Sequence, residues 1–260
     1  MLTVISPAKT LDFDTPAGTR KKTQPQLIEY AEQLVEDARA LAPNEIRGLM
    51  GVSEKIADLN YQRFLNFTTP FTLENAKQSL LAFKGDVYLG LEAQTLDKEQ
   101  LDFAQHHLAI LSGLYGVLRP LDLMQPYRLE MGLTFANRGG KNLYEFWGGE
   151  ITRILQKGLK KSGSKVLVNL ASNEYFRSVQ AGDLDADIIT PVFKDLRGGK
   201  YKVISFFAKK ARGQMARFII DKELNEAEGL KKFKRDGYRF NRAESTARNW
   251  VFTRDEPPIS

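Results

Sequence analysis

The sequence predicts an α/β fold of the mixed type: one compact domain in which helices flank a mixed sheet. Apolar stretches typical of buried strands, such as Val166–Leu170, alternate along the chain with amphipathic helical patterns. No internal repeat, low-complexity segment or linker divides the 260 residues, of which 42% are hydrophobic. We therefore expect a single domain over residues 1–260, with a pair of short helices embedded at 44–66.

The first predicted elements are a strand and a long helix. Thr3–Ser6 is a short apolar strand, and polar residues, Lys9 among them, follow where it ends. Polar residues just beyond a strand commonly line a site, and a plain surface loop is the alternative. An amphipathic helix with five apolar residues on one face follows over Pro25–Ala42, and Pro43 ends it.

Residues 44–66 predict two short helices joined by a tight turn. Asn44 can cap the first helix, and Ser53 can cap the second after the turn Gly51-Val52-Ser53. This frame resembles the helix-hairpin-helix element of DNA repair proteins, whose backbone N–H groups hold a DNA phosphate without reading sequence. Lys55 stands where a second phosphate contact can form. Ser53 replaces the usual second glycine, and an ordinary αα-hairpin is the alternative interpretation.

Charged residues crowd the middle of the chain. A capping box at Asp97–Gln100 opens a helix to about His107, and Leu108–Leu111 follows as a buried strand. Pro126–Met131 is a further strand candidate. Around it lie two basic and two acidic residues, which form either an internal ion-pair network or the floor of a polar cleft: Arg119, Asp122, Arg128 and Glu130.

A second strand–helix junction follows. A capping box at Asn142–Glu145 opens an amphipathic helix to Lys161, and Val166–Leu170 is a buried strand. Ser172, Asn173 and Glu174 lie directly after that strand and start the next short helix. Such a junction commonly forms a ligand-facing edge.

The most basic part of the chain is a predicted hairpin followed by a helix. Val192–Leu196 and Lys202–Phe207 have strand patterns, and Arg197-Gly198-Gly199 between them suits a tight turn. A helical pattern runs from Ala208 to Ile219, and terminal strands are expected near the end of the chain, at Tyr238–Phe240 and Trp250–Thr253.

Positive charge is concentrated in two segments. Lys194–Arg217 contains eight basic residues against Asp195, and Lys231–Arg242 contains six against Asp236. The rest of the chain is therefore net negative, although the whole chain carries +6. Concentrated charge with interleaved aromatics, such as Phe206, suits a polyanion such as nucleic acid. A solvated basic face is the alternative.

Composition excludes several kinds of chemistry. The chain has no cysteine, which removes disulfides, thiolate nucleophiles and cysteine-ligated metals and is consistent with a cytosolic protein. His106 and His107 are the only histidines, and adjacent helix positions point in different directions. We expect no metal site, no cofactor, no membrane span and no signal peptide.

Five stretches of the chain together form a recognisable set of motifs. They are SPAKTL at Ser6–Leu11, FKGDVY at Phe83–Tyr88, the long segment Leu111–Met131, NLASNEY at Asn169–Tyr175, and FAKKARGQMARFII at Phe207–Ile220. With these motifs the chain resembles the YaaA family of bacterial peroxide-stress proteins. The resemblance implies a soluble cytoplasmic protein that limits oxidative damage and free intracellular iron during peroxide stress. It also implies a compact α/β fold with a helix-hairpin-helix element and a positively charged cleft that binds DNA.

Two functional hypotheses are open, with a third ranked last. The first is DNA backbone binding, with ten candidate contact residues: Gly51, Val52, Ser53, Lys55, Arg119, Arg128, Lys209, Lys210, Arg212 and Arg217. The second is a lyase-like or glycosylase-like enzyme acting on DNA or a nucleotide, with candidate catalytic residues Lys9, Lys84, Asp86, Asp122 and Glu174, and with Lys209 beside them. Direct iron sequestration, which would need a carboxylate cage, is the third.

Overall fold

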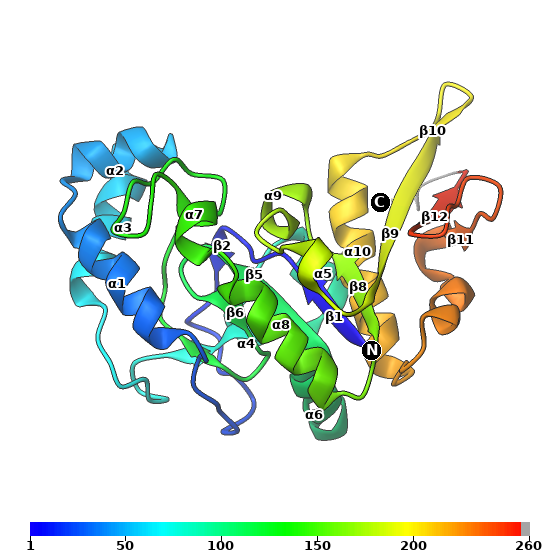
Figure 1. Ribbon diagram of the computed structural model, residues 1–260, viewed down its shortest axis with the longest axis horizontal. Coiled ribbons are helices and arrows are strands. Elements are labelled where there is room, and N and C mark those ends of the chain that lie inside the picture. Colours follow the sequence, from blue (N-terminus) through cyan, green and yellow to red (C-terminus); the bar gives the residue numbers. More distant parts are fainter. Residues whose placement is uncertain (256–260) are drawn as a thin grey trace.

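The computed structural model, which describes residues 1–255, confirms the mixed α/β class (Figure 1). Its centre is an eight-stranded sheet in the order β11-β12-β9-β8-β1-β5-β6, with β10 beside β9. The five adjacent strands β12, β9, β8, β1 and β5 run parallel, and β6, β10 and β11 pair antiparallel with their neighbours. The bounds are β1 Leu2–Ile5, β5 Leu108–Ser112, β6 Gly116–Leu118, β8 Val166–Leu170, β9 Asp187–Arg197, β10 Lys200–Lys202, β11 Arg239–Phe240 and β12 Asn249–Arg254.

Two small antiparallel ladders lie outside this sheet. The first joins β2 (Thr10–Leu11) to β4 (Phe83–Lys84), and the second joins β3 (Lys77–Gln78) to β7 (Leu123–Met124). In the first ladder Thr10 stands opposite Lys84. This pairing therefore brings Lys84 next to the segment that follows β1.

Ten α-helices are found within the described residues: α1 Ile28–Arg39, α2 Pro43–Met50, α3 Glu54–Asn66, α4 Ser79–Ala82, α5 Asp86–Leu91, α6 Lys98–His107, α7 Leu143–Trp147, α8 Glu150–Lys161, α9 Asn173–Phe176 and α10 Ser205–Asp221. Four short 3₁₀ turns accompany them: Ala93–Thr95, Ala181–Asp183, Ala227–Lys232 and Arg235–Gly237. None of these helices, all within residues 1–255, is both long and apolar enough to cross a bilayer.

Three local expectations differ from the structure. Pro43 does not simply end α1. It starts α2, where its fixed φ and missing N–H suit the first helical turn. The second strand of the basic hairpin stops at Lys202, so Phe206 and Phe207 belong to α10. Residues 126–131 form no strand, although alternate residues, Tyr127, Leu129 and Met131, are buried.

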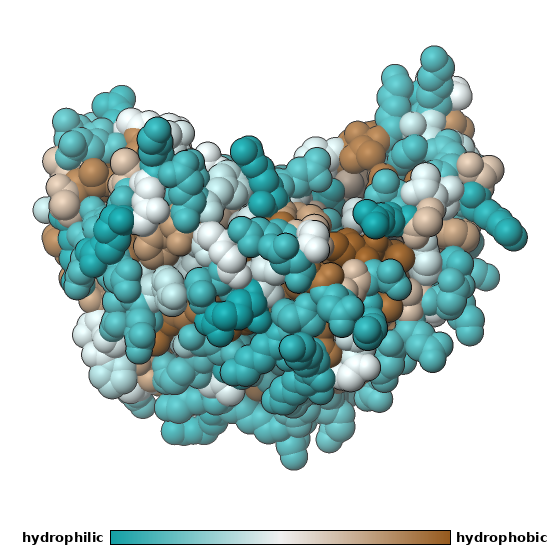
Figure 2. All heavy atoms as spheres, viewed as in Figure 1, coloured by the Kyte–Doolittle hydropathy of each residue, from teal (hydrophilic) through white to brown (hydrophobic). Residues whose placement is uncertain are grey.

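The molecule has a hollow between two raised ends (Figures 1 and 2). Helices α1, α2 and α3 gather at one end, and the β9–β10 hairpin with α10 and β12 forms the other. Buried aromatic rings pack under the second end, where Phe193 contacts Phe233, Tyr238 and Phe252. We refer to the face that contains this hollow as the concave face.

One buried ion pair changes the charge balance of the hairpin end. Asp195, the only acidic residue of the Lys194–Arg217 segment, is completely buried and pairs with Arg254. Tyr238 also donates a hydrogen bond to it. The surface of the β9–β10 hairpin is therefore cationic, with Arg197, Lys200 and Lys202 exposed.

Candidate functional site

A cavity of about 420 Å³ lies at the carboxyl ends of β1 and β8. Figure 1 places the neighbouring elements β2, α5 and α9 beneath the hollow. Five basic and three acidic residues line the cavity, together with three tyrosines: Lys9, Lys84, Arg128, Lys209 and Arg212; Asp86, Glu130 and Glu174; and Tyr88, Tyr127 and Tyr175.

The ends of the two parallel strands are tied together directly. The Ser6 hydroxyl, just after β1, accepts a hydrogen bond of 2.8 Å from the backbone N–H of Ser172, just after β8. Ser172 in turn caps α9 through its side chain. The Tyr88 hydroxyl donates to the carbonyl of Ser6 at 3.1 Å. These bonds fix the segments that carry Lys9 and Glu174 at the cavity rim.

The position of α10 depends on a close helix crossing with α5. A Cβ atom added at Gly213 would lie 1.8 Å from the carbonyl oxygen of Val87, and one at Gly90 would lie 2.1 Å from the carbonyl oxygen of Lys210. Only glycine allows the two backbones to approach so closely. This crossing sets Lys209 and Arg212 of α10 against the same cavity as Asp86 of α5.

Glu130 connects two of the cavity cations. Its Oε1 atom lies 3.0 Å from the Lys9 Nζ and 3.0 Å from an Arg128 guanidinium nitrogen. Its Oε2 atom is buried and accepts no hydrogen bond within residues 1–255. One carboxylate oxygen at the cavity is therefore a buried acceptor that no described residue satisfies.

Lys209 and Arg212 differ from the other cations. Neither forms an ion pair or a side-chain hydrogen bond with any described residue, whereas Lys84 lies 3.9 Å from Asp12. Burial lowers the pKa of the half-buried Arg212 guanidinium, with no acidic side chain opposing the shift. The group still carries its charge at neutral pH, because an arginine pKa lies far above 7.

Seven of the predicted site residues converge on this cavity. They are Lys9, Lys84, Asp86 and Glu174 from the catalytic candidates, and Arg128, Lys209 and Arg212 from the DNA-binding candidates. Lys210 and Arg217 lie elsewhere on α10, paired with Asp236 and Asp221 respectively.

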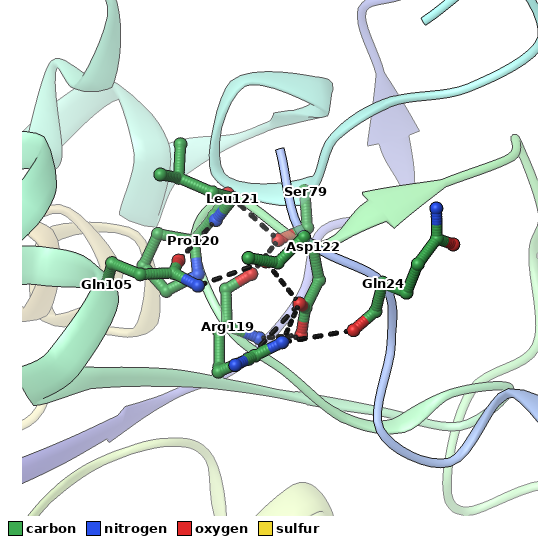
Figure 3. A network of polar contacts seen from close by, with 8 residues as sticks. Gln24, Ser79, Gln105, Arg119, Pro120, Leu121 and Asp122 are labelled. Atoms are coloured by element: carbon green, nitrogen blue, oxygen red, sulfur yellow. Dashed lines mark hydrogen bonds and ion pairs between the residues drawn. The ribbon is translucent and has the colours of Figure 1, made fainter. Parts of the chain in front are cut away.

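Arg119 and Asp122 form an internal network away from the cavity (Figure 3). Asp122 is completely buried, lies 2.7 Å from the Arg119 guanidinium, and accepts a 2.6 Å hydrogen bond from the Thr23 hydroxyl. The four charged residues predicted for this region therefore belong to two separate groups. Arg119 and Asp122 stabilise the fold, whereas Arg128 and Glu130 line the cavity.

The predicted helix pair at 44–66 is present as α2 and α3, with Gly51 in the left-handed conformation at φ +60°. The N–H groups of Gly51 and Val52 both donate to the carbonyl of Arg47, closing α2. The N–H groups of Ser53, Glu54 and Lys55 have no partner within residues 1–255. Phosphate binding at this turn therefore stays a prediction, and its donors would be those three groups.

The three cavity tyrosines were not among the predicted site residues. Tyr88 and Tyr127 are almost completely buried, and a buried tyrosine in a sequence cannot be distinguished from an ordinary core residue. Burial raises the pKa of both phenols, so both are neutral hydrogen-bonding groups at physiological pH.

The fold and this site define a class: an α/β protein with a cationic cavity at the carboxyl edge of its parallel strands. The chain belongs to the YaaA family of peroxide stress proteins, whose family model, described as peroxide stress protein YaaA, matches residues 1–244. It is 59% identical over 257 residues to a UPF0246 protein of Cellvibrio japonicus, covering 99% of this chain and 100% of that protein. A UPF0246 protein of Teredinibacter turnerae is 56% identical over 256 residues, covering 98% and 100%.

Proposed function

We propose that this peroxide stress protein is a cytoplasmic DNA-binding protein that contacts the DNA backbone along its concave face. The observation that supports this most directly is the convergence of five basic side chains on one cavity in that face. Backbone contacts by lysine and arginine position a protein on DNA without reading sequence. The proposal therefore includes weak sequence preference.

The β9–β10 hairpin supplies a second group of cations on the same surface. Arg197, Lys200 and Lys202 are exposed, and their acidic neighbour Asp195 is buried in its pair with Arg254. A duplex lying along the concave face can contact both groups. Several phosphates would then be neutralised together, and each releases counterions.

Salt dependence tests this mode of binding. We expect the logarithm of the affinity for a labelled duplex to fall linearly with log salt, with a slope of about −0.9 for each phosphate contacted. Fluorescence anisotropy at several salt concentrations, with duplexes of unrelated sequence, measures this slope. A flat salt response would refute backbone binding.

The helix pair can be tested separately through Glu54. This exposed carboxylate starts α3, beside the free N–H groups, and would repel a phosphate bound there. If the turn contacts DNA, Glu54→Gln should raise duplex affinity about two- to fivefold, as expected from roughly 0.5–1 kcal/mol of relieved repulsion. The control is Glu99→Gln, an equally exposed carboxylate in the first turn of α6. Equal affinities of the two variants would make α2–α3 an ordinary αα-hairpin.

The lowered free iron implied by the family resemblance is proposed to be indirect. Within residues 1–255, no three side chains of the types that bind metals lie close enough together to hold an ion. We expect protein purified without added chelator to contain far less than one iron per chain. Elemental analysis checks this, and a stoichiometric iron content that survives washing with chelator would favour sequestration.

A second candidate function is catalysis on DNA or a nucleotide by a lyase-like or glycosylase-like reaction. One observation favours it: the Lys9 amine lies 3.0 Å from Glu130 at the cavity. A lysine amine with a carboxylate beside it can act as nucleophile and acid–base pair. Incubation with duplex, bubble and abasic DNA separates the two functions, because binding shifts a native gel and strand cleavage is seen only on a denaturing gel.

A further inference from the structure

We propose that the cavity binds a single nucleoside phosphate unit, with the phosphate at Lys209 and Arg212 and a hydrogen-bond donor of the nucleoside at Glu130. The inference deepens the proposed function, on which it rests for the choice of a nucleotide among phosphate esters. The exposed amines of Lys9, Lys84 and Lys209 at the rim can also reach a duplex backbone, whereas the cavity itself admits one small ligand and no duplex. Its volume of about 420 Å³ is within the range usual for small-molecule sites.

The first observation is a pair of unpartnered cations. Lys209 and Arg212 lie three residues apart on α10, so they are neighbours on the helix surface. Both line the cavity, and within residues 1–255 neither has an acidic or hydrogen-bonding partner. A half-buried guanidinium without a partner is unfavourable, and an anion that accepts two of its N–H groups removes that penalty.

The second observation concerns the other polar group of the cavity. Glu130 uses Oε1 for Lys9 and Arg128, while its buried Oε2 lacks a hydrogen bond. A carboxylate oxygen can only accept, so the matching ligand atom is a donor: an exocyclic amine or ring N–H of a base, or a free sugar hydroxyl. Inorganic phosphate has neither base nor sugar and can bind the cations without reaching Glu130.

The third observation is the apolar part of the wall. The hydroxyl of Tyr88 is bonded to the Ser6 carbonyl, and that of Tyr127 lies 2.6 Å from the Ser112 hydroxyl. Both phenols are therefore held in place by hydrogen bonds, and both residues form part of the cavity wall. An anion site, a hydrogen-bond acceptor and an aromatic wall together match the phosphate, the donor and the planar base of a nucleotide.

Calorimetry on the intact chain tests the site with defined probes: the four deoxynucleoside 5′-monophosphates, the nucleosides, and inorganic phosphate. We expect at least one monophosphate to bind about tenfold or more tightly than both its nucleoside and inorganic phosphate. Arg212→Gln should weaken binding of that monophosphate by at least about tenfold, since a charged hydrogen bond is lost. Glu130→Gln should weaken binding of the monophosphate and leave the affinity for inorganic phosphate unchanged. The matched control is Arg153→Gln, an exposed arginine on α8.

Folding of the variants is checked by thermal melting without ligand. Arg212 has no partner to lose, so Arg212→Gln should melt no earlier than the parent, and Arg212→Lys keeps the charge as a second test. Monophosphates that bind no better than inorganic phosphate, or a folded Arg212→Gln variant that binds them like the parent, would overturn the inference.

Duplex affinity, measured in parallel, keeps this inference separate from the proposed function. If the parent protein binds a duplex but no monophosphate, the cavity site alone is refuted. If it binds a monophosphate but no duplex, DNA binding alone is refuted. Competition identifies the source of the ligand once the site is established. A monophosphate that displaces a duplex with an unpaired nucleotide, but not a perfect duplex, shows that a nucleotide of DNA enters the cavity. Binding without such competition assigns the site to the free nucleotide.

Discussion

Replacing Lys9, Lys84 and Lys209 together with alanine should weaken duplex binding by roughly two orders of magnitude at physiological salt. The three amines come from separate segments of the chain and meet at one cavity in the concave face. If each contacts one phosphate, their loss should reduce the salt slope by about 2.7, since each contact contributes about 0.9. Anisotropy titrations at several salt concentrations measure both quantities.

A charge-matched variant controls for long-range electrostatics. Lys157, Lys160 and Lys161 lie on α8, on the sheet below the hollow in Figure 1. Their triple replacement by alanine changes the net charge by the same amount and should lower duplex affinity only about two- to threefold, because distant charges are screened. Equal losses for the two triple variants would mean that net charge, and not the cavity, determines binding.

Gly213→Ala should be the most destabilising single methyl addition near the site. The new Cβ would lie 1.8 Å from the carbonyl oxygen of Val87, and neither backbone can move without separating α5 from α10. We expect a loss of about 3 kcal/mol or more in the free energy of unfolding, at the upper end of the effects of overpacking. Urea denaturation followed by circular dichroism measures it.

Gly48→Ala is the matched control for that substitution. Gly48 lies inside α2, and an added Cβ there would meet no atom within 4 Å. Alanine should therefore stabilise the protein by roughly 0.5–1 kcal/mol, because it restricts the unfolded chain and favours the helix. If Gly213→Ala were tolerated as well as Gly48→Ala, the proposed closeness of the α5–α10 crossing would be wrong.

Part of the site could be predicted because strand ends can be identified in a sequence. Thr3–Ser6 and Val166–Leu170 were both expected as strands, and the polar residues after each do meet at one sheet edge. The contribution of Lys84 could not be predicted from local pattern, since it depends on the two-residue ladder between β2 and β4. Pairings so short have no periodicity to detect.

The sequence could also not tell which of two nearby basic residues lines the cavity when both stand in similar local patterns. Lys209 and Lys210 are adjacent, yet the first lines the cavity and the second pairs with Asp236. Arg119 and Arg128 both lie near a carboxylate in sequence, and only Arg128 reaches the cavity. Which side of a helix or loop faces a cavity is decided by tertiary packing, which a single sequence does not reveal.

The central position of β1 has a consequence for synthesis of the chain. This strand pairs on its two sides with β5 and β8, which follow it about a hundred and more than a hundred and sixty residues later. At ribosomal rates of about 5–20 residues per second, Met1–Ile5 waits on the order of 10–30 s for its second partner strand. A short apolar strand with an unpaired edge can pair with another chain. We therefore expect this protein to be most prone to aggregation before β8 has been synthesised and has paired with β1.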